Sequence, residues 1–407
     1  MSKMKSANPR ILLLLPALFG IALCVGCPPL QAANPFQTAN DKQIHGTSSP
    51  ASFDTLAMRA RAAMDADHVA EAIRLYASAT ALRPDWPEGW WHLGTLLFDA
   101  SRFREARDAF AHFVLIERKE PGPGFAMLGF SEFELRHYSS ALAALEHSRK
   151  LNLGTDPVFI RRVLFHDGIL NTLLGRPEVA LERLALAADQ IAAAHPEGPE
   201  DAVCADFDLL DAFGVAALRM PKLPSDLTAS QVPVVRLAGR AQALIALQDR
   251  VAAETQMKQL VALYPAQPGV HYMYGVFLLK DNPPLAVSEF RHEIEVSPSN
   301  AAARIQLALE FLRTAEYEQG LKYAREAVAI APENFVAHVA CGRIWLALGK
   351  TDNALGELRT AVKLAPGSPD AHFALSRALS EAGKEDEAAR ERAVFERLKA
   401  LADAADR

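Results

Sequence analysis

A phrase repeated at a fixed interval constrains this chain more than any other feature of its sequence. Pro298, Pro332 and Pro366 follow one another at intervals of about 34 residues. The last two close nearly the same phrase, Ala-Val-Ala-Ile-Ala-Pro and Ala-Val-Lys-Leu-Ala-Pro. Proline cannot continue a helix, so it commonly follows a helix end. Such a period indicates small helical units stacked in a row, each of which contacts only its neighbours.

The composition also favours helices throughout the chain. Half of the 407 residues are hydrophobic. Ala, Leu, Glu and Arg dominate, whereas the β-branched residues that favour strands are sparse. A chain of this length would ordinarily divide into about two or three domains, but stacked repeats can form one continuous body. The net charge of -6 gives no electrostatic reason to expect binding to nucleic acid.

Within each interval, small and large residues recur in the same order. The unit near residue 90 has Trp90, Leu93, Gly94, Ala106, Phe110 and Phe113, and the unit at 335–368 has Cys341, Gly342, Trp345, Gly349, Ala354, Leu358, Ala361 and Pro366. This pattern resembles that of the tetratricopeptide-repeat family, in which Trp, Leu-Gly and Tyr precede Ala, Phe and Ala. The resemblance implies an all-α fold, a right-handed superhelical solenoid of antiparallel helix hairpins, with about eight or nine units here.

The period also sets the expected domain boundaries. We expect a signal peptide at 1–33, a polar tether at 34–52, an N-terminal repeat block at 53–194, an irregular insertion at 195–233, a C-terminal repeat block at 234–398 and a tail at 399–407. In the insertion, apolar residues at helical spacing predict one helix over 201–220. That helix either packs into the stack or lies in a flexible joint between the two blocks, and the acidic residues around it are expected on a solvated face.

The N-terminus has the form of an export signal. Lys3, Lys5 and Arg10 precede the apolar run 11–25, which is shorter than the roughly 20 residues of a membrane span. Cys27 then stands where a bacterial lipoprotein signal ends, which would make its thiol the site of lipidation. A conventional cut near Ala33 is the alternative. Either way we expect a protein secreted across the inner membrane, periplasmic or lipid-anchored in the cell envelope through Cys27.

Catalytic and metal-binding motifs are not evident. No non-repeat stretch after the signal exceeds about 40 residues, which is too short for an enzyme domain. His271, His338 and His372 occupy the position at which the family has Trp. Successive units lie about 10 Å apart, so these histidines cannot share a metal ion, and aromatic-like packing is the expected role. We therefore expect no catalytic residue, no cofactor and no metal, and no disulfide between Cys204 and Cys341.

The family resemblance also implies where a partner binds. Its ligands lie along a concave face formed by the first helix of each hairpin. The corresponding positions here are Trp91, Phe98, Phe130, Phe133, Phe165, Tyr272, Lys280, Leu309, Arg313, Arg343, Phe373 and Arg377. The aromatic residues suit an apolar or extended peptide, and the basic ones can clamp carboxylates. The alternative is that tight winding buries much of this face as ordinary core.

These observations favour an interaction protein over an enzyme. We expect a scaffold or adaptor of the bacterial cell envelope that binds peptides or helices of a protein partner along the concave face. An accessory or regulatory subunit of an envelope enzyme, which processes peptidoglycan or exported substrates, is the alternative. The sequence does not identify the partner or the oligomeric state.

Overall fold

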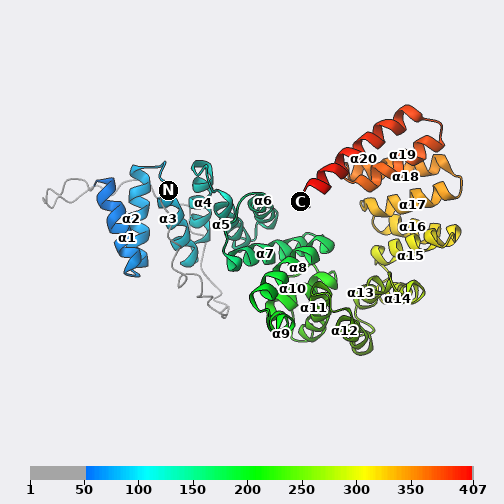
Figure 1. The fold of residues 1–407 in the computed structure, drawn as a ribbon, viewed down its shortest axis with the longest axis horizontal. Helices are drawn as coiled ribbons and strands as arrows, with labels where there is room; N and C mark the ends of the chain where they lie inside the picture. Colours follow the sequence, from blue (N-terminus) through cyan, green and yellow to red (C-terminus); the bar gives the residue numbers. More distant parts are fainter. Residues whose placement is uncertain (1–51, 406–407) are drawn as a thin grey trace, which may run out of the picture. The chain divides into compact units, whose positions relative to one another are not determined.

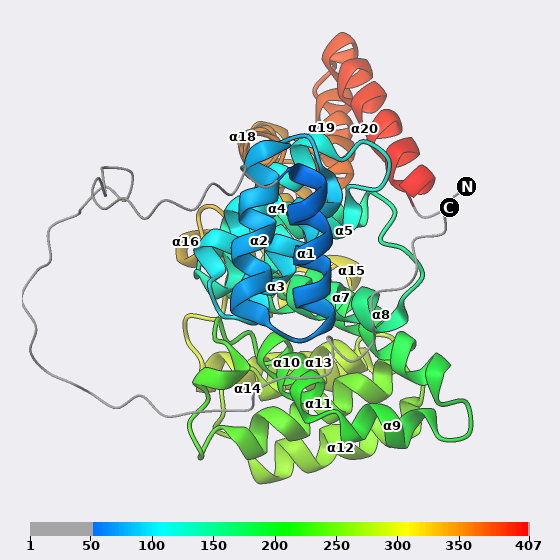
Figure 2. The same ribbon diagram turned by 90° about the vertical axis from the view of Figure 1, so that its left-hand side faces the viewer.

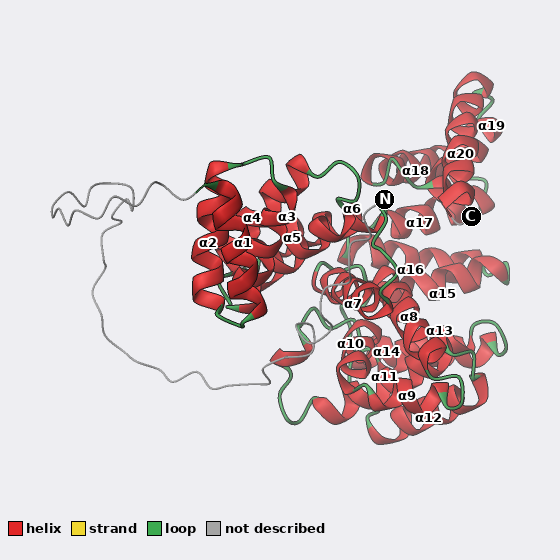
Figure 3. Ribbon diagram, turned by 60° about the vertical axis from the view of Figure 1, so that its left-hand side comes forward, coloured by secondary structure: helices red, strands yellow, loops and turns green. Residues whose placement is uncertain are grey.

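The computed structural model describes residues 52–405, which form helices and connecting loops without a strand in this range (Figures 1 and 3). The helices are α1 (Phe53–Asp65), α2 (Val69–Leu82), α3 (Pro87–Asp99), α4 (Phe103–Ile116), α5 (Gly122–Glu134), α6 (Tyr138–Arg149), α7 (Pro157–Leu173), α8 (Pro177–Ala194), α9 (Pro199–Ala205), α10 (Phe207–Ala217), α11 (Val232–Ala246), α12 (Arg250–Leu263), α13 (Val270–Leu278), α14 (Pro283–Val296), α15 (Ala301–Arg313), α16 (Tyr317–Ile330), α17 (Phe335–Ala347), α18 (Thr351–Leu364), α19 (Pro369–Glu381) and α20 (Glu385–Ala405), with a 3₁₀ turn at Pro224–Asp226. The expected signal peptide, Cys27 and the tether up to residue 51 lie outside the described residues.

Consecutive helices pair into hairpins, and each hairpin packs on the next. In the described range the pairs are α1–α2, α3–α4, α5–α6, α7–α8, α11–α12, α13–α14, α15–α16, α17–α18 and α19–α20. First helices of successive units also touch one another, α3 with α5, α15 with α17 and α17 with α19. The expected all-α repeat solenoid is confirmed.

Local sequence signals account for where these helices begin and turn. Asn300, Asn334 and Ser368 follow the periodic prolines, and each side chain accepts a hydrogen bond from a backbone N–H of the helix that follows. The turns inside the last three hairpins each contain one left-handed residue: Ala315, Gly349 and Gly383, with φ of 61°, 70° and 73°. The 34-residue period therefore repeats caps and turns as well as core positions.

The core repeats a small residue and a large one on successive turns of seven of the second helices. In α4 these are Ala106 and Phe110, and both are fully buried. The same arrangement holds for Ala72 with Tyr76, Ala141 with Leu145, Ala180 with Leu184, Ala253 with Met257, Ala286 with Phe290 and Ala354 with Leu358. The small residue admits the first helix of the unit closely, and the large one fills the space behind it.

Residues 195–233 are packed into the stack. Instead of the single expected helix, α9 and α10 form and are separated at Asp206, whose carboxylate caps α10 by accepting from the Leu209 N–H at 3.0 Å. Helix α10 packs against α8 and α11, and α9 also contacts both of these helices (Figure 2). This packing agrees with a degenerate unit in the stack.

Two further expectations change in detail. Asp211 was expected on a solvated face, but it is 8% exposed and its carboxylate accepts two hydrogen bonds from Arg236, at 3.1 and 2.8 Å. Helix α20 continues to Ala405, so most of the expected tail belongs to the last helix. No helix in the described range has the length and apolar character needed to cross a membrane.

Candidate functional site

The residues expected on the inner face divide into packed and exposed groups. Phe130 is 1% exposed and Tyr272 is 8% exposed. Trp91, Phe98, Phe133, Phe165 and Leu309 are half-buried, whereas Lys280, Arg313, Arg343, Phe373 and Arg377 are exposed. The aromatic part of the expected face is thus largely built into the stack, and its basic part faces solvent.

Trp91 and Tyr272 are held by other aromatic and cationic side chains. The Trp91 ring lies 5.8 Å from Phe110 and 5.4 Å from Phe113, both on α4. Tyr272 packs 5.9 Å from Phe290 and lies under the guanidinium of Arg219, 5.2 Å from the ring centre. These contacts make the two residues part of the packing between helices.

Arg162 forms the centre of a cluster that joins three successive units. Its guanidinium, on α7, lies 4.6 Å from the ring centre of Phe130 on α5 and 5.5 Å from that of Phe98 on α3. Asp99 and Glu134, the last residues of α3 and α5, lie close enough to interact with it electrostatically. We call Phe98, Asp99, Phe130, Glu134 and Arg162 the arginine–aromatic cluster.

Arg162 is half-buried, whereas Asp99 and Glu134 at the ends of their helices are exposed. Desolvation raises the pKa of Asp99 and of Glu134, and the positive charge of Arg162 opposes both shifts. Desolvation also lowers the pKa of Arg162, and the two carboxylates offset part of this change. Within residues 52–405 the Arg162 guanidinium makes no hydrogen bond or ion pair.

His166 lies one helical turn after Arg162 on α7 and packs against aromatic rings of α5. Its ring packs 4.8 Å from Phe130 and 5.0 Å from Phe133, and its Nδ1 lies 2.8 Å from the Arg162 carbonyl oxygen. Desolvation and then the nearby Arg162 charge lower the pKa of His166 to about 4. The imidazole is therefore neutral at ordinary pH and packs against Phe130 and Phe133 as an uncharged aromatic ring.

Sequence reasoning missed Arg162, Asp99, Glu134 and His166. One signal was present, because α3 ends in Phe98-Asp99 and the next first helix, α5, ends in Phe133-Glu134. An aromatic residue followed by an acid at the same place in two units indicates an acidic rim beside an apolar face.

The exposed basic residues lie farther along the chain: Lys280 in the turn after α13, and Arg313, Arg343 and Arg377 on α15, α17 and α19. Arg313 pairs with Glu310 of its own helix at 2.9 Å. Phe373 is 46% exposed and contacts Phe395 of α20 with ring centres 5.1 Å apart. The expected carboxylate clamp thus consists of surface cations whose charge solvent screens.

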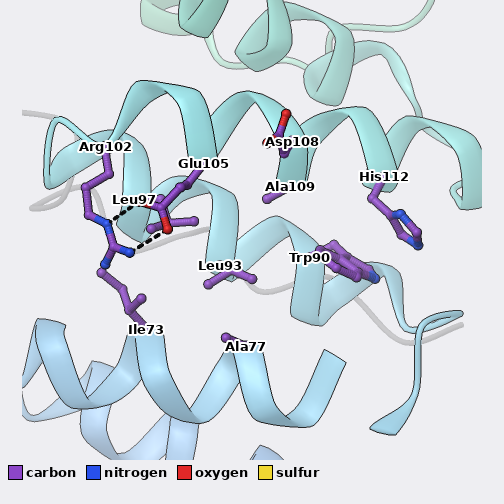
Figure 4. A pocket seen from close by; sticks show the side chains of 10 residues that line it. All are labelled: Ile73, Ala77, Trp90, Leu93, Leu97, Arg102, Glu105, Asp108, Ala109 and His112. Carbon is purple, nitrogen blue, oxygen red and sulfur yellow. Dashed lines mark hydrogen bonds and ion pairs between the residues drawn. The ribbon is translucent and has the colours of Figure 1, made fainter. Parts of the chain in front are cut away.

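A hollow of about 360 Å³ lies on another side of the repeat, between α2, α3 and α4 (Figure 4). Ile73 and Ala77 of α2 face Leu93 and Leu97 of α3 across it. The ring of Trp90 lies 4.3 Å from that of His112 on α4, at a tilt of 36°. Glu105 at its edge is paired with Arg102 through two hydrogen bonds of 2.7 and 2.5 Å. Its polar edge is thus already internally satisfied, which makes it a weaker candidate than the arginine–aromatic cluster.

The three histidines at the family's Trp position form polar clamps, which corrects the expectation of aromatic-like packing. His338 Nδ1 lies 2.6 Å from a Glu357 oxygen, and its Nε2 lies 2.9 Å from the Pro332 carbonyl oxygen. His271 and His372 repeat this arrangement with Glu289 and Glu391 and with the carbonyls of Pro265 and Pro366. Each clamp ties a first helix to its own second helix and to the loop before it.

The two cysteines in the described range are free thiols. Burial raises the pKa of Cys341 to about 12 and also raises that of Cys204. Neither thiol is therefore activated as a nucleophile.

Comparison with known proteins agrees with the repeat architecture. Family models described as tetratricopeptide repeat match residues 57–118 and 346–391. No curated protein matches the chain.

Solved structures that match include three of MamA. A MamA RS-1 ArsTM double mutant is 18% identical, covers 42% of this chain and 97% of its own, and gives a TM-score of 0.38. A crystal structure of MamA is 16% identical, with 40% and 96% covered and a TM-score of 0.36. MamA 41-end from Desulfovibrio magneticus RS-1 is 18% identical, with 41% and 96% covered and a TM-score of 0.37. Likeness at this level carries no inference about function.

Proposed function

We propose that this chain, a member of the tetratricopeptide-repeat family and a scaffold for protein interaction, is an adaptor of the bacterial cell envelope. In this role it binds an extended peptide segment of a partner protein across the arginine–aromatic cluster. The observation that carries the proposal is the Arg162 guanidinium, which is stacked on rings from two neighbouring units and has N–H groups free within the described range.

The chemistry of the cluster suits a peptide backbone. A guanidinium offers five N–H donors in a fixed plane, which can serve the carbonyl oxygens of an extended segment. Carboxylates such as Asp99 and Glu134 can accept backbone amides or a lysine ammonium. The rings of Phe98 and Phe133, half-buried beside them, offer apolar contact to alternate side chains of the segment.

The charge balance predicts what kind of segment is preferred. The cluster carries one cation and two acids, so a ligand with a basic residue gains more electrostatically than one with an acidic residue. The cluster thus has a net negative charge, whereas the exposed arginines of α15, α17 and α19 carry positive charge. A partner segment that is basic where it meets the N-terminal units therefore fits this chain best.

Export of the protein is part of the proposal and rests on the N-terminal sequence. The basic residues before the apolar run 11–25 support passage across the inner membrane, and Cys27 after it supports lipid attachment. A Cys27→Ala variant should move from the membrane fraction to the soluble envelope fraction. Retention of this variant in the membrane would exclude lipidation and favour the cut near Ala33.

Arg162→Leu tests the binding surface without removing its apolar support. Arg161→Leu is the matched control, since Arg161 precedes Arg162 on α7 and lies 3.9 Å from Asp206 instead of over the rings. Both variants should keep the circular dichroism and melting temperature of the wild type. Proteins captured from envelope extracts with the wild type and with Arg161→Leu should be absent with Arg162→Leu.

The captured partner then allows a quantitative test. Peptides that tile its sequence are titrated against each variant by fluorescence anisotropy. Loss of hydrogen bonds to a charged group costs about 1.5–3 kcal/mol, so Arg162→Leu should weaken binding by roughly 10- to 100-fold. Equal affinity of the two leucine variants for every binding peptide would refute the proposed surface.

A further inference from the structure

In several units the tenth residue of the second helix contacts the residue at the family's Trp position on the first helix. Trp90 lies 4.3 Å from His112, and Phe125 lies 4.4 Å from His147. In later units Arg304 pairs with Glu326 at 3.0 Å, and the His271 and His292 rings are 5.3 Å apart. The stack therefore brings whichever residue stands at this position of the second helix against the first helix.

A second position, one turn earlier on the second helix, supplies the glutamates of the histidine clamps. Glu289 and Glu357 lie 2.6 Å from Nδ1 of His271 and His338. In the 268–300 unit alone among the described repeats, this glutamate coincides with a histidine one turn later, His292. The corresponding residue after Glu357 is Thr360, which cannot serve as a nitrogen ligand.

The three side chains have the spacing of a metal-ligand set. One donor atom each from His271, Glu289 and His292 lie within 4.8 Å of one another. Zinc with Zn–N bonds of about 2.1 Å holds two imidazole ring centres about 5 Å apart, close to the observed 5.3 Å. His271 and Glu289 are buried and His292 is exposed, so His292 is the ligand with room to turn toward the other two. His271 Nδ1 and the Glu289 oxygen, now 2.6 Å apart, have to separate by somewhat less than about 1 Å to share a tetrahedral ion.

The surroundings already orient the buried ligands. His271 Nε2 lies 3.0 Å from the Pro265 carbonyl oxygen, which leaves Nδ1 on the side of Glu289. Metal-bound histidines usually donate their other ring N–H to such a carbonyl. The neighbouring Glu293 is unavailable, because its oxygens accept from the Gly269 and Tyr272 N–H groups and from Asn300.

We propose that His271 Nδ1, a Glu289 carboxylate oxygen and a His292 ring nitrogen bind one divalent transition-metal ion, Zn²⁺ foremost. Two imidazoles and one carboxylate are a known zinc set that keeps a fourth position open, and water fills it on the exposed side of His292. The ion takes the place of the proton that joins His271 Nδ1 to Glu289 without the ion, and that proton is released to solvent. The Nε2–H remains bonded to Pro265.

Metal binding is measured on the purified, tag-free protein. Zn²⁺ is titrated by calorimetry, and Co²⁺ by the visible absorption that a tetrahedral site produces. The wild type should bind about one ion per chain. His292→Ala should weaken binding by about tenfold or more. Its melting temperature without metal should stay close to that of the wild type, since His292 is exposed and the variant loses only the contact with the His271 ring.

Two matched variants separate this site from ordinary surface histidines. His147→Ala removes an exposed histidine from the same helix position of another unit, where no glutamate accompanies it, and should leave binding unchanged. Thr360→His supplies the missing ligand beside His338 and Glu357 and should add a second site. A wild type that binds no ion at about 1 mM Zn²⁺, or a His292→Ala variant that binds as tightly as the wild type, would overturn the proposal. Absence of a second site in Thr360→His would overturn the claim that these three positions suffice.

Discussion

The crossing of α10 and α11 decides whether residues 195–233 belong to the stack, and a single methyl group tests it. Gly239 lies in the middle of α11, and a Cβ atom there would stand 1.8 Å from the Leu210 carbonyl oxygen and 3.1 Å from the Gly214 nitrogen. Both atoms are backbone, so no side-chain rotation relieves the clash. Gly239→Ala therefore requires α10 and α11 to separate by more than about 1 Å.

The size of the effect follows from two opposing contributions. Alanine favours a helix interior over glycine by about 1 kcal/mol. Overpacking against an unyielding neighbour costs about 1–3 kcal/mol and occasionally more, and a contact with backbone at 1.8 Å belongs at the upper end. We expect Gly239→Ala to lower the free energy of unfolding by about 2 kcal/mol or more.

Gly356→Ala is the matched control. Gly356 also lies inside a helix, α18, but nothing stands within 4 Å of its added Cβ. This variant should gain about 0.5–1 kcal/mol from helix propensity alone. Urea unfolding followed by circular dichroism measures both variants, and hydrogen exchange read by mass spectrometry shows whether protection is lost in α10 and α11, since repeat arrays can open locally.

The reasoning fails if Gly239→Ala stabilises the protein as Gly356→Ala does. It also fails if α10 and α11 keep their protection from exchange. Either result would mean that the two helices do not cross this closely in solution, and residues 195–233 would then be a joint between two blocks.

Two further predictions concern Phe130 of the arginine–aromatic cluster and His166, which packs against it. Phe130→Ala should lower the free energy of unfolding by about 3–5 kcal/mol because the ring is fully buried, whereas Phe373→Ala should cost less than about 1 kcal/mol; equal shifts in thermal melts would contradict these burials. The pKa of His166 is about 4 in the folded protein and about 6.5 in the unfolded chain. Above a pH of about 6.5 the ring is neutral in both states, and below it the unfolded chain takes up a proton that the folded protein does not. The free energy of unfolding therefore falls as the pH falls below about 6.5. Between pH 7 and pH 5 the free energy of unfolding should fall by about 2 kcal/mol in the wild type, and this loss should be absent in His166→Phe. Urea unfolding of both proteins at both pH values measures it, and an equal change in the two proteins would refute the prediction.

The repeat architecture was readable from the sequence because its causes are local. Periodic prolines, caps such as Asn334 and turn residues such as Gly349 act within a few positions of one another. Their interval survives in the structure as the interval between hairpins. The break between α9 and α10 was missed because the apolar stripe continues through it, although Asp206 is a good N-cap residue.

The environment of the binding face was not readable to the same degree. A repeat position tells which way Phe130 points from its own helix, but its burial depends on Arg162 and His166 of the next unit. Likewise the sequence around Asp211 is acidic and indicates a solvated face, but in the structure Arg236 of α11 pairs with its carboxylate. Contacts between units decide both cases, and no regularity within one unit encodes them.

The hydrogen bond to the periodic proline explains why units without the family's tryptophan still belong to the stack. Trp90 Nε1 donates to the Pro84 carbonyl oxygen at 2.8 Å. His271, His338 and His372 place Nε2 at 3.0, 2.9 and 3.0 Å from the carbonyl of the proline that precedes each of them at the same distance along the chain. The replacement thus keeps a ring nitrogen against the same carbonyl and adds a glutamate on the other side. A family model that scores side-chain identity treats this exchange as a departure from the repeat pattern. This is consistent with the family matches, which cover only residues 57–118 and 346–391 although the hairpins continue between them. The same exchange places a glutamate beside His271, His338 and His372, and of these three units only the one at 268–300 adds a histidine, His292, as the third ligand of the proposed metal site.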